Sequence, residues 1–294
     1  MIVPAPLPPT RIGPRVFEWG SRTFVMGIVN VTPDSFSGDG LLAAGSSGAA
    51  SGSGAPVTAA LAQARRMVEE GADILDVGGE STRPGHESVS AEEEAARVVP
   101  VIAAIHAALP DVPISVDTSK AAVAAAALDA GAVLLNDVWG VGGDDAMARL
   151  AGERQVPLVV MHNRAEPRYE DFVAEMLAGL RDALTRAQKF GVPRENLVVD
   201  PGFGFGKTPE HNLELMRHLP EMRALGHPVL LGTSRKSTLG RVLGGLPPED
   251  RLEATLATTA LGIAGGVDLV RVHDVQANVR VARMADAILR GGTA

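Results

Sequence analysis

Polar and charged side chains recur at the ends of short apolar runs along this 294-residue chain. One such residue alone would more simply be a helix cap. The same pattern at run after run instead favours a site, because the carboxyl ends of parallel strands meet at one mouth of a barrel, where the chemistry of that fold takes place. The residues are Asn30, Asp76, Asp117, Asn136, Asp137, His162, Asp200, Arg271 and His273.

These residues divide by chemical character. Asp117, Asn136 and Asp200 offer acceptors and an amide, which suit a flat heterocycle with several N–H donors. An asparagine, an arginine and a histidine, at 30, 271 and 273, can together hold a diphosphate or a metal attached to it. His273 taken alone could equally be a packed core histidine. The pattern therefore predicts a site that is acidic on one side and cationic on the other.

Three glycine-containing loops follow predicted strands. The loop 78–85 is too rich in glycine and proline for a helix and presents hydroxyls and a guanidinium. The loop 232–237 enters a helix at about Ser237, where backbone N–H groups favour an anion such as a carboxylate. The loop 200–208 contains Gly206-Lys207-Thr208, but Pro201 occupies the position where a nucleotide-binding P-loop needs glycine. An aromatic ring of this loop, Phe203 or Phe205, could face a flat ligand or pack beneath the loop.

Several classes of enzyme are excluded by what the sequence lacks. The chain has no cysteine, so it has no disulfide, thiolate metal site or cysteine nucleophile. Neither a Gly-x-Ser-x-Gly elbow nor a His-Glu-x-x-His pair occurs, which leaves serine hydrolases and zinc proteases without support.

Eight short runs that are apolar throughout predict buried parallel strands between helical segments. The expected strands are 24–29, 74–77, 114–116, 133–135, 157–161, 197–199, 228–231 and 268–272, and clear helical segments are 57–70, 91–108, 172–190 and 275–290. Eight strand–helix units in this length predict an α/β fold, a single-domain (β/α)8 TIM barrel spanning 21–294, after an N-terminal extension at 1–20. Residues 41–56, nearly all Gly, Ala and Ser, predict a flexible loop that is either a bland insertion or a lid.

Charge and hydropathy restrict the partners and the location. The net charge of −8 argues against a nucleic acid or an anionic membrane surface as the main partner. No apolar run reaches the roughly 18 residues of a membrane span, and the first residues do not have the pattern of a secretion signal. A cytoplasmic protein with small-molecule substrates is therefore expected.

Taken in order, the motifs resemble one family closely, the dihydropteroate synthases, which are pterin-binding enzymes. The likeness extends from about residue 24 to 288, and its blocks are 27–37, 76–85, 115–118, 136–138, 200–207, 234–237 and 271–275. It implies a transferase of folate biosynthesis that condenses 6-hydroxymethyl-7,8-dihydropterin pyrophosphate with p-aminobenzoate. The products would be 7,8-dihydropteroate and pyrophosphate.

The resemblance also implies a role for individual residues, a magnesium ion as cofactor and a homodimer formed through outer barrel helices. The pterin would be bound by Asp117, Asn136, Met161, Asp200, Phe205, Gly232 and Lys236. The pyrophosphate would be bound by Asn30, Arg271 and His273, with Asn30 also a metal ligand. The p-aminobenzoate would be bound by Phe36, Thr82, Arg83, Pro84, Phe205, Lys236 and Ser237. The catalytic groups would be Asp117, Lys236, Arg271 and His273.

Three departures from the family pattern concern loops. Gly38-Asp39-Gly40 reverses the usual order of Asp and Gly, and the insertion of Ala, Gly and Ser then lengthens the loop after the first predicted strand. Ala165 stands where the family tends to have glycine, so the loop after the fifth predicted strand could take another path. Two alternatives stay open. A methyltetrahydrofolate-dependent corrinoid methyltransferase would share the pterin carboxylates but would not need a diphosphate site. A non-catalytic pterin-binding paralogue would retain the ring of polar residues without turnover.

Overall fold

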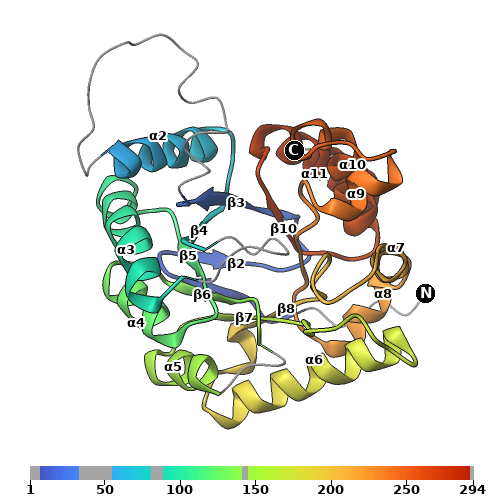
Figure 1. The fold of residues 1–294 in the computed structure, drawn as a ribbon, viewed down its shortest axis with the longest axis horizontal. Helices are drawn as coiled ribbons and strands as arrows, with labels where there is room; N and C mark the ends of the chain where they lie inside the picture. Colours follow the sequence, from blue (N-terminus) through green and yellow to red (C-terminus); the bar gives the residue numbers. More distant parts are fainter. Residues whose placement is uncertain (1–6, 33–54, 81–88, 141–144, 292–294) are drawn as a thin grey trace.

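Eight parallel strands form a barrel with helices around it in the computed structural model, which describes residues 7–32, 55–80, 89–140 and 145–291 (Figure 1). The strands are β3 (Phe24–Asn30), β4 (Ile74–Gly78), β5 (Ile114–Asp117), β6 (Leu134–Asp137), β7 (Leu158–Met161), β8 (Leu197–Asp200), β9 (Leu230–Leu231) and β10 (Leu269–Val272). Their order is β8-β7-β6-β5-β4-β3-β10-β9, and a bridge between Val199 and Val229 brings β9 back to β8. The predicted TIM barrel is confirmed.

The helices between the strands cover the outside of the barrel. They are α2 (Ala55–Glu69), α3 (Ala91–Ala108), α4 (Ala121–Asp129), α5 (Ala146–Arg154), α6 (Phe172–Lys189), α7 (Pro209–Arg217), α8 (Leu219–Met222), α9 (Ser237–Val242), α10 (Leu252–Ala264) and α11 (Val275–Arg290). Gly131 shows why glycine follows several of these helices. Its φ is +114°, and a Cβ there would lie 2.5 Å from Cγ of His106, so a side chain would be strained and would also clash.

Most predicted boundaries agree with the structure within two residues, and the differences have local causes. The strand predicted at 228–231 is reduced to Leu230–Leu231, although Val229 still bridges to β8. The predicted loop 41–56 is too long at its end, because residues 55 and 56 already belong to α2. Pro56 is accommodated there since the first turn of a helix needs no N–H from it. The rest of that loop lies outside the described residues.

Alternate residues of each strand face opposite sides. On β4, Leu75 and Val77 pack with the surrounding helices, whereas Ile74 joins a second apolar cluster inside the barrel. Asp76 and Gly78 lie on the same side as Ile74 and therefore face the barrel interior. The interior is apolar toward the amino-terminal end of the barrel, here called the lower interior. Toward the carboxyl-terminal end, the upper interior, it carries the polar residues.

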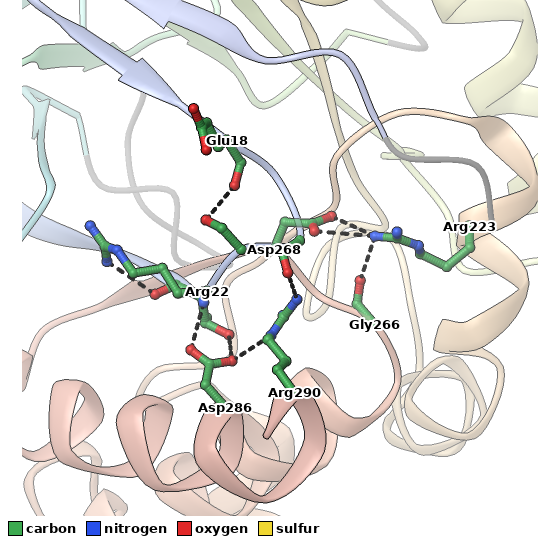
Figure 2. A network of polar contacts seen from close by, with 10 residues as sticks. Glu18, Arg22, Arg223, Gly266, Asp268, Asp286 and Arg290 are labelled. Atoms are coloured by element: carbon green, nitrogen blue, oxygen red, sulfur yellow. Dashed lines mark hydrogen bonds and ion pairs between the residues drawn. The ribbon is translucent and has the colours of Figure 1, made fainter. Parts of the chain in front are cut away.

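A short antiparallel hairpin, β1 (Thr10–Ile12) and β2 (Arg15–Phe17), packs against the amino-terminal end of the barrel. Ile12, Phe17 and Trp19 belong to the same buried cluster as the inner strand residues. The segment predicted as an extension thus contributes to the barrel core. Nearby, Asp286 and Arg290 of α11 bind residues just before β3, and Asp268, just before β10, pairs with Arg223 (Figure 2). No helix in the described part of the chain is long and apolar enough to cross a membrane.

Candidate active site at the carboxyl end of the barrel

Three strands place a linked set of charged side chains inside the upper barrel. Arg271 on β10 donates from Nε to Oδ2 of Asp76 on β4, at 2.6 Å, and from Nη2 to Oδ2 of Asp117 on β5, at 2.5 Å. Asn136 on β6 donates from Nδ2 to the same Asp76 oxygen, at 3.0 Å. Residues far apart in the sequence are therefore joined by hydrogen bonds, as the ring of polar strand ends requires.

Burial gives these groups unusual protonation behaviour. It raises the pKa of Asp117 to about 7, against the opposing charge of Arg271. Burial also raises the pKa of Asp200, although the N–H of Gly202 donates to its Oδ1 at 2.7 Å. Burial also disfavours the charged form of Arg271. Asp76 and Asp117 outweigh this effect and raise the pKa of the guanidinium, which stays cationic. A fixed cation thus pairs with Asp117, a carboxylate that can change its charge near neutral pH.

Lys236 lies between the acidic residues and the aromatic loop. Its Nζ is 3.6 Å from the centroid of the Phe205 ring. Burial, reinforced by Arg271, lowers the pKa of the lysine to about 7, although Asp200 and Asp117 oppose this. Ser237 follows as the exposed first residue of α9, where the helix was predicted to begin.

The aromatic loop after β8 is fixed by a half-buried lysine that was not assigned a role from the sequence. Lys207 donates from Nζ to the carbonyl oxygens of His162 and Phe205, at 3.1 and 3.0 Å, and lies 3.0 Å from Nδ1 of His162. Burial lowers the pKa of Lys207 to about 7. Phe203 is buried under the loop, while Phe205 is only half-buried and faces Lys236. The packing role left open from the sequence thus belongs to Phe203, and the role of Phe205 in facing a flat ligand stays a prediction.

Gly202 and Gly206 allow this loop to lie directly against the loop after β7. Both have positive φ, and a Cβ at Gly202 would lie 2.0 Å from the His162 carbonyl oxygen. Gly206 similarly approaches the backbone of Arg164, and its carbonyl oxygen accepts from the Tyr169 hydroxyl at 2.8 Å. Glycine at both positions is therefore required by close backbone contact.

The residues predicted to hold the diphosphate lie at the carboxyl ends of β3 and β10. Nδ1 of His273 lies 2.9 Å from Oγ of Ser234, and Arg235, with a φ of +58°, forms a two-pronged ion pair with Asp274. These contacts join the loop after β9 to the end of β10. Asn30 ends β3 with a half-buried side chain.

Of the other predicted site residues, two lie at the mouth of the barrel and four lie outside the described residues. Met161 is buried at the end of β7, and Gly232 directly follows β9, where a Cβ would lie 3.8 Å from Cβ of Arg271. Phe36, Thr82, Arg83 and Pro84 lie outside the described residues. Just before that segment, Glu80 pairs with Lys120, whose Nζ also donates to the buried Glu94 at 2.6 Å. This cluster fixes the start of the loop that follows β4.

The sequence did not assign roles to Asp76 and Lys207. Asp76 was recognised as a polar strand residue, but which partners it meets depends on strand register. Lys207 was visible only through the Gly-Lys-Thr that imitates a P-loop. A signal existed in both cases, namely a charge placed among apolar or glycine residues next to a strand end.

Comparison with known proteins places the chain in a family. The model of the pterin binding enzymes matches residues 26–273. The dihydropteroate synthase of Clostridium beijerinckii is 48% identical over 281 residues, which cover 95% of this chain and 99% of the relative.

Solved structures agree. A dihydropteroate synthase from Clostridium difficile, determined in the presence of pteroic acid, superposes with a TM-score of 0.86 at 47% identity, covering 93% of this chain and 99% of that one. The Xanthomonas albilineans enzyme in complex with 7,8-dihydropteroate has a TM-score of 0.83 at 40% identity, covering 96% and 98%. The chain belongs to the pterin-binding enzymes and, within them, to the dihydropteroate synthases.

Proposed function

We propose that the upper barrel carries out the dihydropteroate synthase reaction, in which the amine of p-aminobenzoate displaces pyrophosphate from the methylene carbon of a dihydropterin. The observation that carries this proposal is that the buried Asp117, Asn136 and Asp200 lie with the half-buried Lys236 beside Arg271 and His273. Acceptors for a pterin and donors for a diphosphate thus lie at one mouth. No specific observation favours the corrinoid methyltransferase or the non-catalytic paralogue.

The pterin is proposed to bind on the acidic side. Oδ1 of Asp117 is buried without a hydrogen-bond partner among the described residues, and such an atom costs free energy unless a ligand satisfies it. A pterin carries ring and exocyclic N–H groups that can donate to Asp117 and Asp200. Met161 and Phe205 would border the flat ring.

The chemistry then depends on charge separation. As the carbon–oxygen bond to pyrophosphate breaks, negative charge grows on the leaving group and positive charge on the pterin methylene. His273 and the cationic Arg271 would stabilise the leaving group, and the carboxylates would stabilise the electron-rich ring. The aryl amine is neutral at pH 7 and attacks directly, losing its proton after the new carbon–nitrogen bond forms, so a strong general base is not needed.

Magnesium is proposed to enter with the diphosphate. The described residues include no cluster of three His, Asp or Glu side chains that could hold a metal. The amide oxygen of Asn30 suits an ion that keeps several waters and takes its other ligands from substrate phosphates. When bound, the ion would neutralise charge on the leaving group.

The p-aminobenzoate is proposed to bind between Phe205, Lys236 and Ser237. The ammonium of Lys236 and the hydroxyl and N–H groups at the start of α9 would attract the carboxylate. The further contacts implied by the resemblance, from Phe36, Thr82, Arg83 and Pro84, stay predictions. The cytoplasmic location and the absence of a nucleic-acid partner also stay predictions.

A homodimer is proposed to form through α10 and α11, which pack side by side on the barrel (Figure 1). Their outer faces expose large apolar side chains: Leu261 by 64%, Met284 by 63%, Ile288 by 69% and Leu289 by 52%. Such a group of exposed apolar residues favours a protein contact. Light scattering should give a dimer for the wild type and a monomer for M284E/I288E, with V16E on the hairpin as an exposed apolar control. An M284E/I288E variant that stays dimeric, or a V16E control that becomes monomeric, would contradict this interface.

The reaction itself is tested by following pyrophosphate release and 7,8-dihydropteroate formation from the purified protein. Both should require p-aminobenzoate and magnesium, and a sulfonamide should compete with p-aminobenzoate. Pyrophosphate release that does not depend on the amine, or no product at any magnesium concentration, would contradict the proposal.

A further inference from the structure

Asp76 is the most buried acidic residue in the upper barrel, with no exposed surface. It lies on β4 one inward position below Gly78, which is in register with Asp117 on β5. Its Oδ2 accepts two hydrogen bonds, from Nε of Arg271 and Nδ2 of Asn136. Both donors belong to the proposed substrate-binding set, and Asp76 lies beneath them.

These two bonds fix the orientation of both donors. Arg271 uses Nε on Asp76 and Nη2 on Asp117, so the plane of its guanidinium is set by two points on different strands. Asn136 uses its amide nitrogen on Asp76, which turns its amide oxygen away from that carboxylate. The oxygen is then the part of Asn136 that is left to accept from a pterin N–H.

A purely structural role explains Asp76 poorly. Its Oδ1 is buried without a partner among the described residues, and no backbone N–H donates to either oxygen in the hydrogen bonds of those residues. A buried carboxylate of this kind stabilises a fold less well than an apolar side chain of similar volume. By contrast, Asp268 at the opposite end of the barrel accepts from Arg223 with both oxygens and from the N–H of Val229.

We propose that Asp76 is a positioning residue for the reaction, which holds Arg271 and Asn136 in the orientations in which they meet the diphosphate and the pterin. The inference rests on the proposed roles of those two residues. Asp76 itself contacts neither substrate. It acts through the guanidinium group of Arg271 and through the side-chain amide of Asn136.

The charge of Asp76 also gives this role an effect that can be measured in the pH profile of kcat/KM. The charged groups that face Asp117 are Arg271, Asp76, Lys236 and Glu94, and among them Asp76 and Glu94 raise its pKa. Removing the charge of Asp76 should therefore lower the pKa of Asp117. If an ionised Asp117 binds the pterin, the acidic limb of kcat/KM then moves to lower pH.

The test compares Asp76→Asn with Asp268→Asn, a matched loss of a buried aspartate that pairs with arginine. For D76N we expect kcat/KM for the pterin pyrophosphate to fall about 10- to 100-fold, as for other outer partners of site residues. Its KM for p-aminobenzoate should change little, and its acidic limb should lie at lower pH. D268N should lower the melting temperature while leaving kcat/KM and the pH profile unchanged.

Two results would overturn the proposal. One is D76N with kcat/KM within about threefold of the wild type. The other is a loss of activity that follows the loss of melting temperature with an unmoved pH profile, because that is a structural role only. If D76N does not fold, Asp76→Ser leaves room for water and takes its place. Failure of the proposed function would appear separately, as a wild-type protein without turnover.

Discussion

The two ends of the barrel use the same residue types in different ways. At the amino-terminal end, Asp268 pairs with Arg223, and Asp286 accepts from Arg290 and from the backbone N–H and hydroxyl of Thr23 (Figure 2). At the carboxyl end, Asp76 and Asp117 share the single Arg271 and each keep one buried oxygen without a partner among the described residues. One end satisfies its polar groups internally, and the other keeps groups for a ligand.

The apolar residues follow the same division. Phe17, Trp19 and Phe24 pack together below the barrel with ring centroids 4.8 to 5.6 Å apart. At the mouth, Phe205 is half-buried and meets the ammonium of Lys236. Stability is therefore concentrated at one end and reactivity at the other.

The largest expected effect is at Asp117. Replacing Asp117 with Asn removes the proposed pterin acceptor, and kcat/KM for the pterin pyrophosphate should fall about 100- to 1,000-fold, a loss typical of one electrostatic contact at a reacting centre. At pH 7 the melting temperature should change little, because Arg271 keeps its bond to Asp76. Steady-state kinetics and calorimetry check both statements. Unchanged turnover would remove Asp117 from the mechanism.

A smaller effect is expected at Lys207, which fixes the aromatic loop without reaching a reacting atom. Lys207→Met loses the bonds to the carbonyl oxygens of His162 and Phe205, and kcat/KM should fall about tenfold through misplacement of Phe205. The exposed Lys189 on α6, changed to Met, is the control. Equal kinetics for the two variants would show that the anchored loop does not set the site.

At the opposite end, loss of a satisfied aspartate should reduce stability alone. Asp286→Ala leaves the backbone N–H of Thr23 without its acceptor, which costs about 1–3 kcal/mol. Thermal unfolding should show a melting temperature lower by several degrees, with kcat/KM unchanged. A matching loss of activity in the folded variant would mean that the two ends are not separate.

A last expected effect is on the pH dependence of stability. Because the pKa of Asp117 is raised from 3.8 to about 7 in the folded protein, its contribution is present below pH 4 and is lost as the pH rises to 7. Relative to D117N, the wild type should therefore lose stability over that range. Lys236, with its pKa lowered from 10.5 to about 7, should show the reverse against K236M, a relative gain from pH 7 to 10.5. Denaturant unfolding at each pH measures both, and flat differences would contradict the assigned shifts.

The sequence was sufficient for the barrel because its strands are buried on both faces and read as continuous apolar runs. It was also sufficient for the ring of polar residues, since each ends such a run, follows it or lies one residue before its end. It could not indicate that Arg271 bends down to Asp76 and Asp117, because that contact depends on the register of three strands distant in the sequence. The hairpin at 10–17 was also missed, since three-residue strands beside prolines carry too little periodicity to be recognised.

The most direct test is a crystal structure of the protein with a pterin and pyrophosphate bound. We expect a pterin whose N–H groups donate to Oδ1 of Asp117 and to Asp200, with pyrophosphate on the side of Asn30, Arg271 and His273. A pterin bound elsewhere, with Asp117 still paired only to Arg271, would contradict it.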